Sequence, residues 1–178
     1  LLFLLTLLLP AAFRRRDNNW EMHPSFGAVA EDIIFIVTSF TIAHSITLSL
    51  VAFGYLSLSS SIVEPVIALS IMAAAVHNIF PLFHKRRWTL AFIFGLIHGF
   101  GFAGILMEAD IEPKSIWSPL LGFNLGVELG QLLIVFVAIP FIYYGSKFKW
   151  YKATFLNLGS IAAFLCGLYW LIERTILS

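Results

Sequence analysis

Three ionisable residues lie near the middle of long apolar segments. His44 lies in segment 33–54, His98 in segment 88–108 and Glu128 in segment 118–145. A charged side chain at the centre of a bilayer costs about 2.5–3.5 kcal/mol on insertion scales, so a residue retained there indicates a function. Two imidazoles and a carboxylate suit Zn, Ni, Co or Fe, and they also suit a proton relay. These three residues therefore predict a metal site at the bilayer midplane.

Polar neighbours on the same helices strengthen this prediction. Thr41 lies one turn before His44, and Ser45 directly follows it. On the other helix, Asn124 and Gln131 share one stripe with Glu128, because residues three and four apart lie on the same helix face. Such groups orient metal-bound imidazoles, so we expect these four residues to form the second layer of the site.

Two further residues could lie on a route to such a site. Glu64 lies just inside one apolar segment, where a cation could enter, although an acid in the first turn of a helix is ordinary. His77 lies beyond the middle of the same segment, where a cation could leave. His23 and His84 fall in polar loops, and we assign them no role. For every buried polar residue, simple hydrogen bonding between helices is the alternative explanation.

The elements that must position these residues are membrane-spanning helices. The chain has 178 residues, of which 60% are hydrophobic and 12% charged, about half the charged share of a soluble domain. The mean hydropathy is +0.91. The net charge of +1 indicates no nucleic-acid partner, and the single cysteine, Cys166, excludes an intrachain disulfide or a cysteine cluster for a metal.

Short polar segments divide the chain into six apolar segments, and all but the first are long enough to cross the roughly 30 Å of hydrocarbon as a helix. The sequence thus predicts an all-α bundle of six transmembrane helices in one domain, 1–178. We expect the first, which is too short to span alone, to be the inner half of a helix that begins upstream of Leu1. The predicted spans are 1–13 (partial), 33–54, 62–83, 88–108, 118–145 and 153–172.

The loops between the spans alternate in charge. Nine of the eleven basic residues fall in three alternate loops, which the positive-inside rule places in the cytoplasm, with the C-terminus outside. These predicted cytoplasmic loops are 14–32, 84–88 and 146–152. Within the spans, Gly95 and Gly99 have the small-x-x-x-small spacing that allows close helix packing, and Gly122, Gly126 and Gly130 repeat it.

Four blocks, "FTIAHSITLSL", "VEPVIALSI", "RRWTLAFIFGLIHGFGFAGILME" and "FNLGVELGQ", resemble the HupE/UreJ family of bacterial membrane proteins over residues 1 to about 140. The resemblance implies a protein of the bacterial inner membrane, associated with hydrogenase or urease operons, that handles nickel or cobalt at His44, His98 and Glu128. It also implies an Asp and a His upstream of Leu1. One departure concerns nickel: Phe94 and Gly101 occupy positions where the nickel branch has a ligand His and Glu.

Three functions are compatible with these residues. The first is a permease or uptake accessory for a divalent transition-metal ion, which is a transporter and not an enzyme. The second is an intramembrane metal-dependent hydrolase in which Glu128 acts as general base. The third is a structural accessory subunit of a larger membrane complex, whose partners would be other membrane proteins. The lipid bilayer and a metal ion are the partners that the first function requires.

Overall fold

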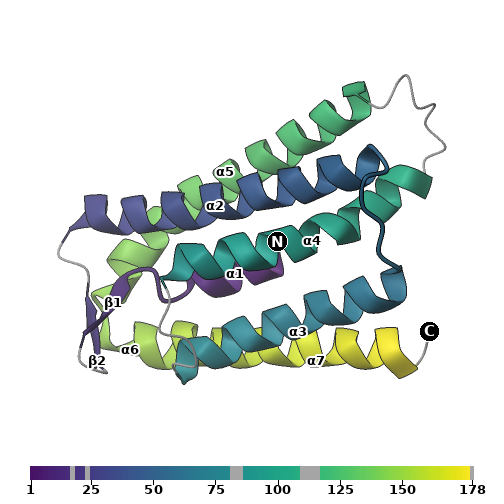
Figure 1. Cartoon of the computed structure of the whole chain (residues 1–178). Helices are drawn as coiled ribbons and strands as arrows, with labels where there is room; N and C mark the ends of the chain where they lie inside the picture. Colours follow the sequence, from purple (N-terminus) through teal and green to yellow (C-terminus); the bar gives the residue numbers. More distant parts are fainter. Residues whose placement is uncertain (17–18, 23–24, 81–85, 109–116, 177–178) are drawn as a thin grey trace.

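The computed structural model is a bundle of long helices with one small hairpin at its end (Figure 1). It describes residues 1–16, 19–22, 25–80, 86–108 and 117–176. The long helices are α2 (Phe26–Ala52), α3 (Ser60–Ile79), α4 (Arg87–Glu108), α5 (Trp117–Ser146) and α7 (Gly159–Ile176). The shorter elements are α1 (Leu2–Leu8), β1 (Phe13–Arg16), β2 (Asn19–Met22), α6 (Lys149–Tyr151) and the π-helix η2 (Lys152–Leu158).

The helix ends follow local chemistry. Ser25 caps α2 by accepting a hydrogen bond from the backbone N–H of Ala28, and Ser59 similarly accepts from Ser61 at the start of α3. Gly54, with φ of 76°, follows the end of α2, since a glycine adopts this left-handed conformation without a steric cost. Phe80 is extended at the end of α3, as expected for a residue that precedes a proline.

The predicted all-α fold is confirmed in its main part, with one exception in segment 14–32. This segment was expected to be a loop, but β1 and β2 pair as an antiparallel hairpin, with Phe13 opposite Met22 and Arg16 opposite Asn19. The following helix, α2, starts at Phe26, before the predicted boundary at residue 33. The reason is that Ser25 supplies an N-cap, so the helix starts before the apolar segment and includes the charged residues Glu31 and Asp32.

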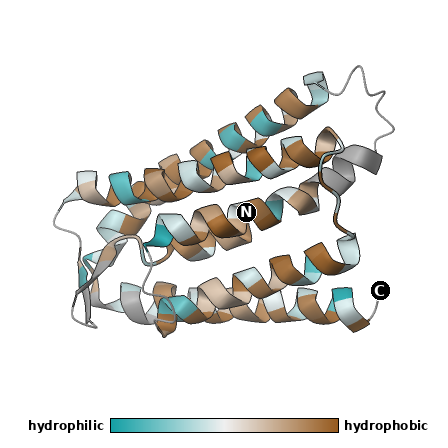
Figure 2. Cartoon of the chain, in the orientation of Figure 1, coloured by the Kyte–Doolittle hydropathy of each residue, from teal (hydrophilic) through white to brown (hydrophobic). Residues whose placement is uncertain are grey.

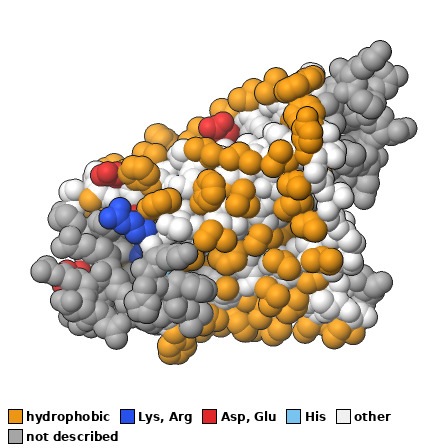
Figure 3. All heavy atoms as spheres, in the orientation of Figure 1, with side chains coloured by type: hydrophobic (Ala, Val, Ile, Leu, Met, Phe, Trp, Pro, Cys, Tyr) orange, Lys and Arg blue, Asp and Glu red, His pale blue; other side chains and the backbone are white. Residues whose placement is uncertain are grey.

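Four helices in the described part of the chain are long and apolar enough to cross a membrane. They support a membrane location, whereas the count of six spans remains a prediction. Hydrophobic residues cover the helices along most of their length and much of the molecular surface (Figures 2 and 3). The four helices cover Phe26–Ala52, Ser60–Ile79, Trp117–Ser146 and Thr154–Ile176.

Helices α2 and α4 are parallel neighbours in close contact. A Cβ atom at Gly95 would lie 2.7 Å from the Phe40 carbonyl oxygen, and one at Gly99 would lie 2.6 Å from the His44 carbonyl oxygen. Only glycine allows these two backbones to approach so closely. The predicted role of the Gly95–Gly99 pair is therefore confirmed.

The glycines of α5 do not act in the same way within this chain. A Cβ atom at Gly122, Gly126 or Gly130 would have no described atom within 4 Å. The prediction that these glycines repeat the close packing of α4 is therefore wrong for the described helices. Sequence spacing placed them on one helix face, but α5 turns that face outward.

The short helix α1 lies in the core, where polar side chains hold it in place. Phe3, Leu4 and Leu7 are buried. The Asn78 side chain on α3 donates to the Thr6 carbonyl oxygen (2.7 Å) and to Ser160 Oγ on α7 (3.1 Å). One buried amide thus connects three helices, and it fixes their relative height.

Charged side chains gather at the end of the bundle that holds the hairpin (Figure 3). Arg87, at the start of α4, donates to the Phe13 carbonyl oxygen (2.7 Å) and lies 3.6 Å from an Asp32 carboxylate oxygen on α2. This end also receives the ends of α3 and α5 and the short helix α6 (Figure 1). The described parts of the three predicted cytoplasmic loops therefore lie at one end, as their alternation along the chain requires.

Candidate metal site

Helices α2 and α4 bring His44 and His98 into one aromatic cluster. The Phe40 ring contacts both imidazoles, with its centroid 5.8 Å from that of His44 and 5.5 Å from that of His98. Phe3 of α1 contacts His98 at 4.9 Å between centroids, and Phe102 contacts His44 at 5.3 Å. The close packing at Gly95 and Gly99 explains this proximity, because each glycine lies within four residues of His98 on the same helix.

Ser70 of α3 sets the hydrogen-bonding state of His98. Its hydroxyl donates to the Ile67 carbonyl oxygen at 2.6 Å and lies 2.9 Å from His98 Nε2. A hydroxyl has one hydrogen, so Ser70 must accept from His98, and Nε2 carries the proton. This tautomer leaves Nδ1 of His98 as the basic nitrogen with a free lone pair.

His44 lacks any such partner. Its side chain is 2% exposed, and neither ring nitrogen has a hydrogen-bond partner in the described structure. A buried polar group left in this state costs about 1–3 kcal/mol. Buried polar groups without a hydrogen-bond partner are rare in folded proteins. A bound ligand would explain why His44 is buried in this state.

The four residues expected in the second layer form a polar seam between α2 and α5. Thr41 donates to Gln131 Oε1 (2.8 Å), and Ser45 donates to Asn124 Oδ1 (2.9 Å). Among the described residues, no hydrogen bond joins this seam to either histidine. The seam thus orients α5 on α2, and its predicted action on a bound metal remains untested.

Glu128 lies apart from the histidines. Its side chain is exposed on α5, although Asn124 and Gln131 on the same stripe face α2. A four-residue step rotates a side chain by about 40° around a helix, which is enough to move Glu128 from the edge of the contact to the surface. The described residues contain no group of three or more His, Cys, Asp or Glu side chains arranged to hold a metal. Its role as a third ligand therefore stays a prediction that this arrangement does not support.

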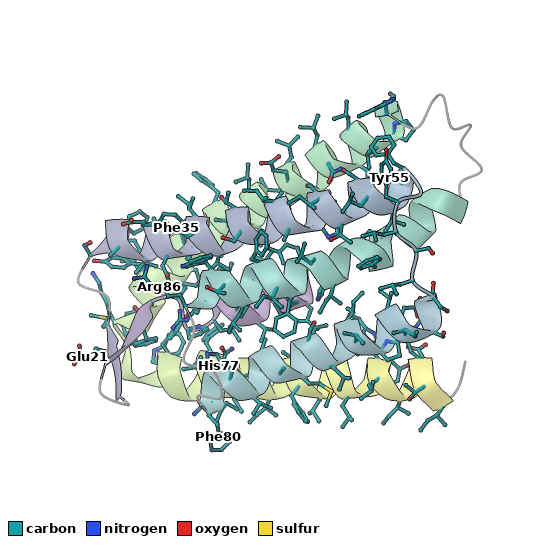
Figure 4. All side chains as sticks on the ribbon, viewed as in Figure 1. Glu21, Phe35, Tyr55, His77, Phe80 and Arg86 are labelled. Carbon is teal, nitrogen blue, oxygen red and sulfur yellow. The ribbon has the colours of Figure 1, made fainter. Side chains whose placement is uncertain are left out.

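The two residues expected on a cation route lie toward opposite ends of α3. Glu64 is partly exposed, and its carboxylate lies 3.1 Å from the Arg174 guanidinium on α7. His77 is 8% exposed and lies near the hairpin end of the bundle (Figure 4). An arriving cation at Glu64 would compete with Arg174 for the same carboxylate.

Sequence reasoning missed Ser70 and the aromatic walls. Ser70 is a polar residue inside a predicted span, so the depth argument applied to His98 could have identified it. Phe3, Phe40 and Phe102 gave no such signal, since phenylalanine occurs 18 times in the chain. Their role depends on which faces of α1, α2 and α4 meet.

The family description "HupE / UreJ protein" matches residues 1–174. The chain belongs to the HupE/UreJ family. The match includes α7, which lies beyond the blocks that carried the resemblance in the sequence. No curated protein and no solved structure matches this HupE/UreJ protein.

Proposed function

We propose that this HupE/UreJ protein is a permease or uptake accessory for a divalent transition-metal ion, and that His44 and His98 bind the ion at the middle of the membrane. Its family is linked to nickel and cobalt uptake for hydrogenase and urease. The observation that carries the proposal is His44, a buried imidazole whose two nitrogens have no hydrogen-bond partner among the described residues. A metal ion supplies the missing partner.

The chemistry of the pair suits transport. Neutral imidazole nitrogen binds Ni, Co and Zn. Two protein nitrogens leave most of the coordination sphere to water or to other groups, so the ion is held weakly enough to leave again. Conduction requires this balance between binding and release. The Phe40 ring beside both imidazoles adds a modest attraction for a cation.

The route follows α3 in this proposal. A cation approaches at Glu64, passes the histidine pair, and leaves past His77 toward the basic end of the bundle. The basic end faces the cytoplasm of a bacterial inner membrane by the positive-inside rule. The metal is the cargo, so neither histidine has to hold it permanently.

The hydrolase alternative receives less support from this arrangement. It requires Glu128 to act as a base beside the ion, but Glu128 is exposed on α5 and lies outside any metal-ligating group of described residues. The alternative of a structural subunit treats His44 as packing, and the experiment below separates it from transport.

The replacement His44→Leu tests the proposal. Leucine fills a similar volume without leaving polar atoms unpaired, so we expect the metal-free protein to unfold at the same temperature or a higher one. Uptake of radioactive nickel, cobalt or zinc into proteoliposomes should fall to the level of empty vesicles. Thr175→Ala, at an exposed hydroxyl that bonds only within its own helix turn, is the control. A His44→Leu protein that keeps uptake would refute the metal site, and one with a much lower melting temperature would favour the structural role.

A further inference from the structure

An ion that reaches the proposed site must pass the walls around His44, whose side chain is 2% exposed. Three described aromatic rings contact the two histidines, and they belong to Phe3, Phe40 and Phe102. Phe3 and Phe40 are 1% and 4% exposed, so they lie in the core of the bundle, whereas Phe102 is 38% exposed. Of these three rings, only Phe102 therefore separates a histidine from the molecular surface.

Backbone packing closes two other sides of α4. A Cβ atom at Gly99 would lie 2.6 Å from the His44 carbonyl oxygen, and one at Gly101 would lie 2.6 Å from the Ile67 side chain on α3. Contacts this close leave no room for an ion, whose bonds to its ligand atoms are themselves about 2 Å long. An approach to His44 therefore requires that a side chain moves.

Phe102 is placed to make such a movement. It lies one turn beyond His98 on α4, toward the end of the bundle opposite the hairpin, which we call the outer end (Figure 1). Its ring contacts His44 at 5.3 Å between centroids and Phe123 of α5 at 5.4 Å. A phenylalanine in a helix has two common χ1 rotamers, so the ring can swing while the backbone stays in place.

Polar groups lie beside this ring contact. Ser45 directly follows His44, Asn124 directly follows Phe123, and the Ser45 hydroxyl donates to Asn124 Oδ1 at 2.9 Å. Hydroxyl and amide oxygens can replace part of the hydration shell of a cation. An ion that approaches Phe102 from the α5 side therefore meets polar atoms before it meets the ring, which favours this side over one covered only by lipid.

We propose that Phe102 is a gate over His44: its ring covers the imidazole in the closed position, and rotation about χ1 opens a path to His44 from the outer end. Hydrophobic constrictions gate other membrane pathways by excluding water. The inference rests on the proposed function and adds the step by which the ion reaches His44. Glu64, at the start of α3, lies toward the same outer end, so the gate is on the entry side (Figure 1).

Chemical modification of His44 tests the gate without any metal. Diethyl pyrocarbonate reacts with imidazole nitrogens, and mass spectrometry of peptides separates His44 from the other histidines. In Phe102→Ala we expect His44 to react about tenfold faster, because the closed position loses the ring contacts with His44 and Phe123. Phe102→Leu keeps more of the packing and repeats the test if alanine lowers the melting temperature.

Phe53→Ala is the matched control for this measurement. Phe53 is 36% exposed at the outer end and contacts Trp117 of α5, with no described ring contact to either histidine. His44 should react at the wild-type rate in this variant. An unchanged rate in both Phe102 variants, or an equal increase in Phe53→Ala, would overturn the proposal.

Stopped-flow binding of Co²⁺ to the full chain separates a gate from a ligand. A gate changes the rates of binding and release together. We expect both rates to rise in Phe102→Ala and to fall in Phe102→Trp, with Kd within about threefold of wild type because a ring attracts a cation only modestly. Faster release with an unchanged binding rate would mean that Phe102 holds the ion, and would overturn the gate. A wild-type protein that binds no Co²⁺ would refute the metal site instead, while the modification rates of His44 still decide the gate.

Discussion

At the scale of single residues, the two central histidines differ in what surrounds them. His98 has a hydrogen-bond partner in Ser70, whereas His44 has none within the part of the chain that the structure describes. The hydrogen bond to Ser70 fixes the tautomer of His98, so the lone pair of its Nδ1 has a defined direction. No described hydrogen bond fixes the His44 ring in this way. In the proposed metal site, the pair would combine one ligand oriented by Ser70 with one that gains its first described partner when the cation binds.

Replacing Ser70 tests the orientation of His98. In Ser70→Ala, the Nε2–H of His98 loses its acceptor, and the ring is free to turn or change tautomer. We expect metal affinity to fall by about 10–100-fold, as for other partners of metal-binding histidines. Equilibrium metal binding in detergent measures it. Ser70→Thr keeps the hydroxyl and should retain most of the affinity; equal loss in both variants would mean that packing, not the hydrogen bond, is affected.

At the scale of helices, two interfaces position the site in different ways. Helices α2 and α4 meet through glycine and backbone contact, whereas α2 and α5 meet through paired polar side chains. The first contact places both histidines, and the second fixes the rotation of α5. Changes in the α2–α4 contact should therefore alter the positions of the histidines, whereas changes in the α2–α5 contact should alter the rotation of α5.

The glycine contact predicts a large effect from one methyl group. In Gly99→Ala, the added Cβ would approach backbone and side-chain atoms of α2 below 3 Å, so the helices must move apart. We expect a loss of about 1–3 kcal/mol in the free energy of unfolding, with lower metal affinity. Gly126→Ala, where no described atom lies within 4 Å, should be neutral or slightly stabilising. Denaturation in mixed micelles compares the two, and equal effects would contradict the close packing.

The polar seam predicts a modest coupling between α2 and α5. A double-mutant cycle of Thr41→Val and Gln131→Leu removes one hydrogen bond and both of its partners. We expect a coupling energy of about 0.6 kcal/mol, the average measured between transmembrane helices. Thr41→Val with Asn124→Leu is the control cycle, because these two residues share no hydrogen bond, and it should give a value near zero. A Thr41–Gln131 coupling no larger than this control would remove the seam as an orienting contact.

At the scale of the whole molecule, charge is distributed unequally between the two ends. The hairpin end carries the ion pair of Arg87 with Asp32 and the described part of the basic loops. The opposite end holds the turn between α2 and α3 and the pair of Glu64 with Arg174. This asymmetry predicts the orientation in the membrane.

Single-cysteine labelling in intact cells measures that orientation. Leu58 and Phe148 are matched in exposure, at 54% and 57%. Leu58 lies just before α3, and Phe148 lies between α5 and α6, at the other end of the bundle (Figure 1). On a Cys166→Ser background, Leu58→Cys should react with a membrane-impermeant maleimide. Phe148→Cys should react only after the cells are opened. The reverse pattern would invert the topology and the proposed direction of uptake.

The sequence by itself determined the membrane class, most of the helices, the apolar segments that contain His44, His98 and Glu128, and the family. Hydropathy and residue spacing depend only on neighbours along the chain, so these features can be read without coordinates. It did not reveal the hairpin of 13–22, because a polar segment of that composition has no clear strand signal.

Only the tertiary structure decided which of these residues meet. Rotation of a helix about its axis depends on its packing partners, and α2 and α4 are not adjacent in the sequence. This rotation brings His44 and His98 against the same Phe40 ring and turns Glu128 outward. It also gives Ser70 to His98 as a partner, and leaves His44 without one among the described residues. Residues at one depth can share a site or occupy opposite surfaces, and helix packing makes the difference.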